Sequence, residues 1–169
     1  SKEAFLFSNS KQNIPKSSYI VFVIGSSWES RNYPKEKFVQ VANKLKKDCL
    51  VVWGDNNERQ KAEWMSYKSS FIKLMPKLSL DDLKFISNAS LLIGNDTGPS
   101  HMSWASNVPS IILFGPTPVE RMFQTDLNKE LHSNSEVNHM KLNKKDFSIK
   151  EINVNEIVKV AQNLLRLNS

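Results

Sequence analysis

Short, unbroken runs of apolar residues alternate along this chain with longer stretches in which apolar residues recur every three or four positions. Residues 19–25 form the first run, Tyr-Ile-Val-Phe-Val-Ile-Gly, which is typical of a strand buried on both faces of a parallel sheet. Residues 34–48 then open on a proline and carry Phe38, Val41 and Leu45 at helical spacing. A strand buried on both faces needs helices on each side, so this alternation predicts an α/β fold.

The same alternation continues through the middle of the chain. Four more apolar runs predict strands, at residues 50–53, 71–74, 91–94 and 110–114. Helices are predicted around Ala62–Met65, from Ser79, near Pro99 and over Val154–Leu165, the last capped by Asn153 with Glu156. The expected architecture is a Rossmann-like, doubly wound parallel sheet.

The length of 169 residues corresponds to about one domain. Residues 1–18 are polar, contain Pro15 and show little pattern, so we expect a linker there and one domain over residues 19–169. Residues 125–150 are polar and rich in Asn and Lys. Within them, Val137, Met140 and Leu142 allow one short edge strand.

Composition excludes several classes of protein. The single cysteine, Cys49, sits in an apolar run that predicts burial, which argues against a disulfide framework and for a reducing compartment. No apolar run reaches the ~20 residues that a membrane helix needs, and the first residues lack the layout of a signal peptide.

The net charge of +6 favours anionic partners without choosing among them. His101, His132 and His139 lack metal-ligand spacing, so we expect no metal.

Ligands of open parallel sheets bind beyond the carboxyl ends of the strands, so the loops there matter most. The chain has no Gly-x-Gly-x-x-Gly motif and no P-loop. Residues 94–101, Gly-Asn-Asp-Thr-Gly-Pro-Ser-His, run from a predicted strand into a helix whose free N–H groups can bind a phosphate or diphosphate. The alternative is that Asp96 and Thr97 merely cap the helix, with His101 packed in the core.

Two other loops carry candidate ligand contacts. Ser26, Ser27 and Arg31 follow the first strand and can donate to one phosphate from several directions, although an exposed loop arginine is often only a solubilising charge. Glu58 follows the second strand, where a carboxylate can accept both hydroxyls of a ribose. Glu58 can equally be a first-turn acid that complements the helix dipole.

The loop motifs, taken in order, carry a resemblance. Segments 27–36, 53–58, 75–80, 96–101 and 114–117 resemble the C-terminal half of the ADP-heptose:lipopolysaccharide heptosyltransferases, glycosyltransferase family 9. The likeness covers roughly residues 19–120 and looks strongest to the heptosyltransferase I branch, with Asp-Thr-Gly-x-x-His and Phe-Gly-Pro-Thr its most specific blocks. It implies the GT-B fold, in which two Rossmann-like domains flank the site and the second holds the donor nucleotide.

The resemblance also implies roles for matching positions. Ser26, Ser27 and Arg31 would hold the ADP diphosphate, Glu58 the ribose hydroxyls, and the backbone near Leu78 the adenine edge, while Asp96, Thr97, Gly98 and His101 would line the diphosphate and heptose. Pro118 stands where the family usually has an acid, and Met-Ser-Trp-Ala at residues 102–105 replaces a run of small residues. The catalytic base of the family is an aspartate of the N-terminal domain, so no catalytic residue is expected here and this chain alone should be inactive.

The sequence therefore predicts the donor-binding half of an inverting enzyme that transfers heptose from ADP-heptose to the Kdo region of the lipopolysaccharide inner core. Expected partners are ADP or ADP-heptose, and the acceptor through the other domain, without nucleic acid and without a cofactor, because ADP-heptose is a substrate. The expected location is the cytoplasm, and peripheral contact with the cytoplasmic face of the inner membrane is compatible with it. Two alternatives stay open: a non-catalytic nucleotide- or partner-binding module, and a donor domain for another nucleotide sugar.

Overall fold

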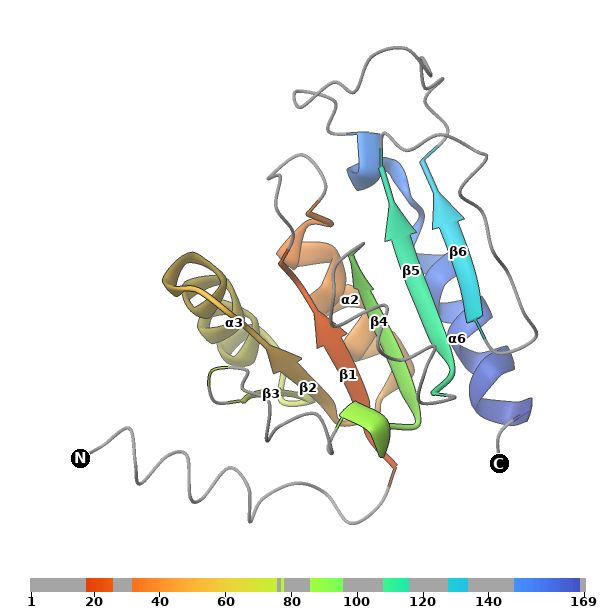
Figure 1. Ribbon diagram of the computed structural model, residues 1–169, viewed down its shortest axis with the longest axis horizontal. Helices are drawn as coiled ribbons and strands as arrows, with labels where there is room; N and C mark the ends of the chain where they lie inside the picture. Colours follow the sequence, from red (N-terminus) through yellow and green to blue (C-terminus); the bar gives the residue numbers. More distant parts are fainter. Residues whose placement is uncertain are drawn as a thin grey trace.

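A computed structural model describes residues 18–25, 32–75, 77, 86–95, 108–115, 128–133 and 148–167, and the statements below concern these residues (Figure 1). The strands are β1 (Ile20–Val23), β2 (Cys49–Val52), β3 (Ile72–Leu74), β4 (Leu91–Asn95), β5 (Ser110–Phe114) and β6 (Asn128–His132). The helices are α2 (Lys35–Leu45), α3 (Asn56–Lys68), the 3-10 turn η4 (Ser148–Glu151) and α6 (Val154–Leu167).

All six strands lie in one parallel sheet with the order β3-β2-β1-β4-β5-β6. Strand β1 is central: Ile20 is paired with Cys49 of β2 on one side and with Leu91 of β4 on the other. The five predicted strands and the α/β parallel architecture are confirmed. The order is that of the dinucleotide-binding Rossmann folds, which was not readable from the sequence.

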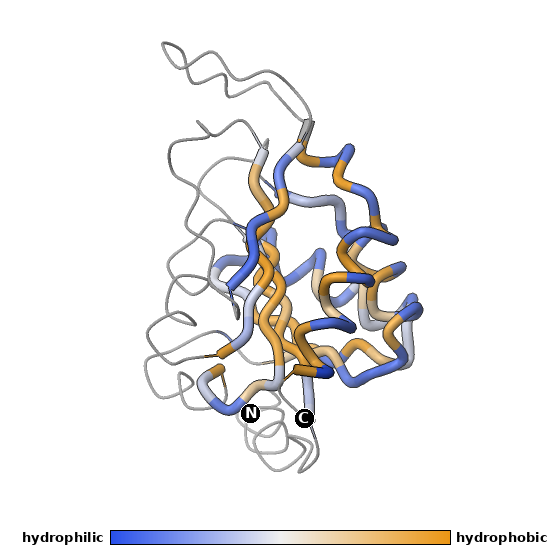
Figure 2. Tube along the Cα trace, turned by 90° about the vertical axis from the view of Figure 1, so that its right-hand side faces the viewer, coloured by the Kyte–Doolittle hydropathy of each residue, from blue (hydrophilic) through white to orange (hydrophobic). Residues whose placement is uncertain are grey.

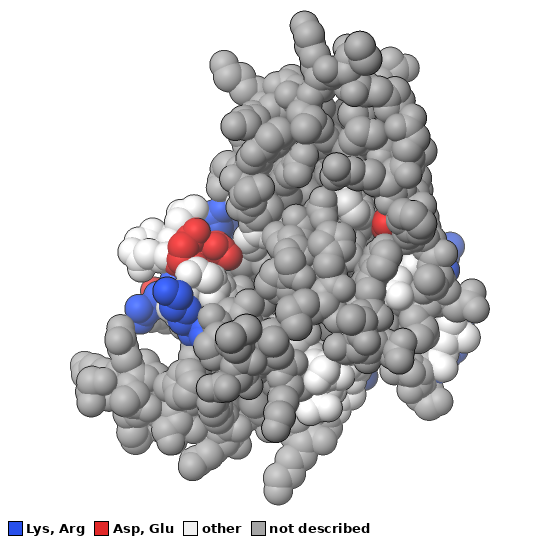
Figure 3. All heavy atoms as spheres, in the orientation of Figure 1, with Lys and Arg blue, Asp and Glu red and all other residues white. Residues whose placement is uncertain are grey.

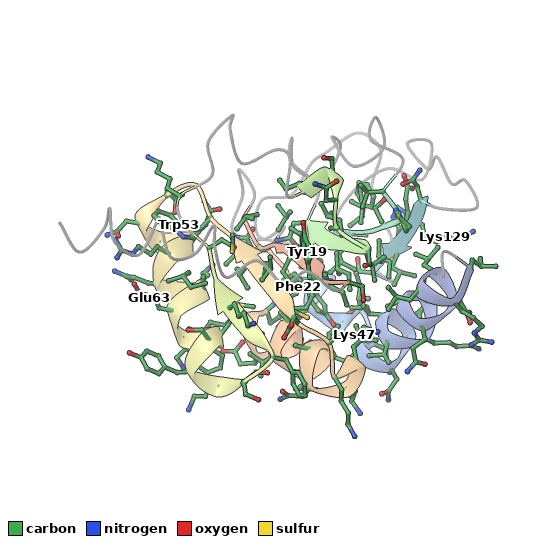
Figure 4. All side chains as sticks on the ribbon, turned by 90° about the horizontal axis from the view of Figure 1, so that it is seen from below. Tyr19, Phe22, Lys47, Trp53, Glu63 and Lys129 are labelled. Carbon is green, nitrogen blue, oxygen red and sulfur yellow. The ribbon has the colours of Figure 1, made fainter. Side chains whose placement is uncertain are left out.

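The apolar residues of β1 divide between two hydrophobic clusters because neighbouring side chains of a strand point to opposite faces. Ile20 and Phe22 belong to the cluster that includes α2, α3 and α6, whereas Val21 and Val23 belong to a second cluster on the other face with Ile86. The three helices lie on one side of the sheet in two perpendicular views (Figures 2 and 4). Their apolar residues turn inward and their polar residues outward (Figure 2).

Each helix begins or ends where its sequence suggests. Helix α2 follows Pro34 and stops at Lys46, which adopts a left-handed conformation (φ 54°) and donates its N–H to the Ala42 carbonyl. The Asp55 side chain caps α3, and the Asn153 side chain accepts from the N–H of Asn155 at the start of α6, which confirms the predicted capping role of Asn153.

Strand β6 was not predicted. Its sequence, Asn-Lys-Glu-Leu-His, is polar, and the strand forms because its backbone pairs with β5 along the sheet edge. The Ser110 hydroxyl donates to Asn128 Oδ1 at 2.7 Å, and the His132 ring stacks on Phe114 with centroids 4.9 Å apart. The edge strand expected around residues 137–142, residues 1–17 of the expected linker, the helix expected near Pro99 and most of the helix expected from Ser79 lie outside the described residues.

Cys49 is fully buried, as predicted, and burial raises the pKa of its thiol. No helix in the described part of the chain is long and apolar enough to cross a membrane.

Candidate functional site

The strand order reverses between β1 and β4. The chain leaves β1 toward β2 and β3 on one side of the sheet, and β4 leads to β5 and β6 on the other. Diverging connections leave a crevice at the carboxyl ends of two such strands, and ligands of open α/β sheets bind there. Ile24 and Gly25 follow β1 at this point, and Asn95 ends β4. In the orientation of Figure 1, acidic side chains gather on the surface over α3 (Figure 3).

The Glu58 carboxylate lies directly over the end of β1. A Cβ atom on Gly25 would lie 2.0 Å from Glu58 Oε1 and 2.4 Å from its Cδ, so the carboxylate occupies the space that a side chain at Gly25 would need. The backbone N–H of Gly54, in the loop after β2, also donates to Oε1 at 3.4 Å. Glu58 in the first turn of α3 thus reaches from the end of β2 to the end of β1.

The Asp55 and Glu58 carboxyl groups form an electrostatic pair. Asp55 Oδ1 accepts the Glu58 N–H at 2.8 Å, and this bond is the main reason that the pKa of Asp55 is lowered. Burial raises the pKa of Glu58, and a hydrogen bond and repulsion from Asp55 raise it further, against the lowering effect of the Gly54 and Asp55 N–H groups. The pair keeps one exposed anion and one partly desolvated acceptor beside the crevice.

Asn95 joins the ends of the two central strands. Its side-chain amide donates to the Ile24 carbonyl at 2.8 Å, and its Oδ1 accepts the N–H of Tyr33 at 3.0 Å. Asn95 is fully buried, so both bonds are made away from water. The Tyr33 hydroxyl in turn donates to the Ile152 carbonyl at 2.6 Å, which ties this corner to the start of α6. The Asn95 side chain therefore holds both flanks of the segment that connects β1 to α2.

Trp53 plays a similar part between β2 and β3. Its indole N–H donates to the Met75 carbonyl at 2.6 Å, directly before the segment that carries Leu78. The Arg59 guanidinium carbon lies 5.5 Å from the centroid of the Trp53 ring, and its Nε contacts Glu63 Oε1 at 3.1 Å. Trp53 thus fixes the end of β3 relative to the start of α3.

A model of the family described as glycosyltransferase family 9 (heptosyltransferase) matches residues 2–152. The chain belongs to glycosyltransferase family 9. Lipopolysaccharide heptosyltransferase 1 of Campylobacter coli is 33% identical over 94% of this chain and 50% of its own length. The enzyme of the same name from Pseudomonas aeruginosa is 29% identical over 61% of this chain and 30% of its own length.

Solved family 9 structures share the fold. E. coli heptosyltransferase WaaC with ADP-2-deoxy-2-fluoro heptose superposes with a TM-score of 0.71 at 18% identity, covering 92% of this chain and 46% of that one. E. coli ADP-heptose lps heptosyltransferase II gives a TM-score of 0.72 at 16% identity, covering 99% and 52%. The chain spans about half the length of these two enzymes and of the Campylobacter coli relative.

Of the family 9 site predicted from the sequence, the structure describes Glu58 and places its carboxylate at the reversal of strand order. The other predicted contacts lie outside the described residues: Ser26, Ser27, Arg31, Leu78, Asp96, Thr97, Gly98 and His101. No group of three or more His, Cys, Asp or Glu side chains in the described part of the chain could hold a metal ion.

Three residues at this edge were missed by the sequence analysis: Gly25, Asn95 and Trp53. Each carried a signal. Gly25 ends an otherwise bulky strand, Asn95 is a polar residue directly after a buried run, and Trp53 begins the Trp-Gly-x-x-x-Glu segment. What the sequence did not reveal was the partner of each residue, because the partners come from other strands.

Proposed function

We propose that this chain is the donor-binding half of a heptosyltransferase and that its ligand is ADP-heptose, bound over the carboxyl ends of β1, β2 and β4. The observation that carries the proposal is the Glu58 carboxylate, which lies over the end of β1 where the strand order reverses. An acidic side chain at this place in a Rossmann fold accepts hydrogen bonds from ribose hydroxyls. The family and the ADP-heptose analogue named in the WaaC structure support the choice of nucleotide sugar.

The remaining contacts of the donor are proposed from the family motifs. The diphosphate would be bound by residues after β1, the adenine edge by backbone near Leu78, and the diphosphate and heptose by the segment after β4. We assign these roles to Ser26, Ser27, Arg31, Leu78, Asp96, Thr97, Gly98 and His101. Asn95 and Trp53 support the proposal because they fix the chain on either side of these segments.

The complete enzyme would transfer heptose with inversion to the Kdo region of lipopolysaccharide. An acceptor hydroxyl attacks the anomeric carbon, its new bond forms as the bond to the ADP oxygen breaks, and a base takes the hydroxyl proton. We place that base in the other half of the enzyme, so the present chain should bind ADP without transferring sugar. No cofactor is required. The net charge of +6 favours an anionic donor and is compatible with a site of action at the cytoplasmic face of the inner membrane.

Calorimetric titration of the 169-residue chain with ADP, UDP and GDP tests the proposal. We expect ADP to bind more tightly than the other two, because the adenine edge would be read by backbone groups that match it. A preference for UDP, or no binding of any of the three, would overturn the ADP assignment. RNA binding that weakens steeply with salt and is unaffected by nucleotide would instead favour a non-catalytic module.

A further inference from the structure

We infer that Gly25 is a positioning residue of the nucleotide site. Because Gly25 has no side chain, the Glu58 carboxylate can occupy the space beside it, and there the carboxylate points toward the ribose. This inference rests on the proposed function and deepens it. Glu58 is the group that would touch the ligand, and Gly25 acts through Glu58. Gly25 lies outside all five segments that resemble the family, the first of which begins at residue 27.

As long as the Glu58 carboxylate keeps its place, there is no room for a side chain at Gly25. A Cβ atom on Gly25 would lie 2.0, 2.4 and 3.0 Å from Oε1, Cδ and Oε2 of Glu58. Carbon and oxygen atoms that are not bonded approach at optimal separations of about 3.5 Å, so all three Glu58 atoms would have to move. They form the far end of a flexible side chain, whereas Gly25 is a buried backbone position that follows the central strand β1 by two residues. An added methyl group would therefore displace the carboxylate and leave the strand in place.

Backbone strain does not explain the glycine. None of the described glycines has a positive φ, so alanine fits the backbone conformation of Gly25. The requirement is for space beside a carboxylate, and this makes a clean substitution possible: the variant changes where Glu58 points and leaves the number of charges unchanged.

Gly54 supplies the matched control. It faces the same carboxylate from the loop after β2, but a Cβ atom on Gly54 would lie 3.9 Å from Glu58 Oε2, which is an ordinary contact. Its backbone N–H, which donates to Oε1, is retained in an alanine variant. Gly25→Ala and Gly54→Ala therefore add the same methyl group near the same acid, and the structure predicts displacement of the carboxylate in the first variant.

The test measures recognition of the ribose hydroxyls. Dissociation constants for ADP, 2′-deoxy-ADP and 3′-deoxy-ADP are determined for the wild-type chain, Gly25→Ala, Gly54→Ala, Glu58→Gln and Gly25→Ala/Glu58→Gln. We expect the wild-type chain to prefer ADP over at least one deoxy analogue by about tenfold or more, since one charge-assisted hydrogen bond is lost. Gly25→Ala and Glu58→Gln should each reduce this ratio to about twofold or less, and the double variant should be no worse than either.

The ratio of the dissociation constants of the deoxy analogues to that of ADP distinguishes a positioning role from a loss of stability. A loss of stability weakens the binding of all three nucleotides alike and leaves the ratio unchanged. A wild-type ratio in Gly25→Ala, an equal loss in Gly54→Ala, or additive effects in the double variant would overturn the inference. If Gly25→Ala does not fold, Gly25→Ala/Glu58→Ala removes every Glu58 atom that crowds the new methyl group and should fold. Failure of that variant too would show that Gly25 serves another contact. A wild-type chain that does not bind ADP would overturn the proposed function, and the inference with it.

Discussion

The interior of the molecule around β1 and the carboxyl ends of β1 and β4 differ in the kind of side chain that they bring together. In the interior, Phe22 contacts Phe38 with ring centroids 5.1 Å apart, and both side chains are completely buried among apolar neighbours. At the carboxyl end, the groups that meet are a buried amide, a carboxylate with a raised pKa and a glycine that leaves room for it. A few residues of chain separate the two environments.

The difference shows where stability is gained and where it is given up. Burying an aromatic side chain in a packed core stabilises a fold by several kcal/mol, because apolar surface is removed from water without loss of hydrogen bonds. A partly buried carboxylate beside another acid lowers stability, yet it provides an acceptor that is already oriented and partly desolvated. Substitutions in the interior should therefore change stability alone, whereas those at the carboxyl end should change binding, with smaller effects on stability.

The largest effect is expected from Phe38→Ala. Phe38 packs between Phe22 and Tyr33, whose ring centroid lies 5.4 Å away, and truncation leaves a cavity in the main cluster. We expect the free energy of unfolding to fall by about 3–5 kcal/mol, measured by urea denaturation. Phe38→Leu, a milder change, should cost less. The preference for ADP over its deoxy analogues should stay at the wild-type value in both variants, and a lost preference would contradict the separation of interior from site.

Asn95→Ala is expected to affect stability and binding together. The substitution leaves two buried groups, the Ile24 carbonyl and the Tyr33 N–H, without the Asn95 partner that each has now. Each such loss costs about 1–2 kcal/mol, in the lower part of the range for a buried polar group left without a partner, so the total should be about 2–4 kcal/mol by urea denaturation. ADP affinity should also fall by about tenfold, since both flanks of the segment bearing Ser26, Ser27 and Arg31 are released.

Tyr33→Phe is the matched control for Asn95→Ala. It removes the hydroxyl bond to the Ile152 carbonyl and keeps the backbone N–H bond to Asn95. We expect a loss of about 1 kcal/mol in unfolding free energy with unchanged ADP affinity. Equal loss of ADP affinity in both variants would mean that the Asn95 bonds have no particular part in positioning the segment.

Much of the fold was predictable because its signals are local. The apolar runs at β1, β2, β4 and β5 are buried on both faces and read as strands without any knowledge of their neighbours. Strand β6 escaped prediction because its polar side chains obey no such pattern. Backbone pairing to β5 and the stack of His132 on Phe114 hold it in the sheet, and neither can be seen in the sequence of β6 itself.

The sequence predicted the kind of side chain that forms the candidate site, but not which residues lie against one another there. Glu58 was identified as a ribose acceptor or a helix-dipole acid, and the structure allows both, since it lies in the first turn of α3 and over the end of β1. The roles of Gly25 and Asn95 depend on contacts across 33 and 71 positions of chain, from Gly25 to Glu58 and from Ile24 to Asn95. Such contacts follow from the order of strands in the sheet, which one sequence does not specify.

The smallest effect on stability, and the one with the opposite sign, is expected from Glu58→Gln. The native state holds the Glu58 proton more tightly than the unfolded chain, in which the pKa is near the ordinary value of 4.5. Stability therefore falls as pH rises from the unfolded pKa through the raised native pKa, and the wild-type chain carries this penalty once its carboxyl group is ionised. The glutamine variant has no charge to desolvate or to repel Asp55, and its amide can still accept the Gly54 N–H. Because Glu58 is partly exposed, we expect the Glu58→Gln variant to be more stable than the wild-type chain by only about 0.5 kcal/mol at pH 7.

The pH dependence of that gap separates the carboxylate from other effects of the substitution. Urea denaturation at pH 7 and at pH 4 should show the advantage of Glu58→Gln shrinking as the wild-type carboxyl group takes up its proton. ADP binding at pH 7 should weaken in the same variant, because a neutral amide replaces the charged acceptor of the ribose hydroxyls. An advantage that is the same at both pH values would trace the effect to packing. Greater stability with weaker binding would show that the carboxyl end of β1 retains a destabilising charge because the ligand requires it.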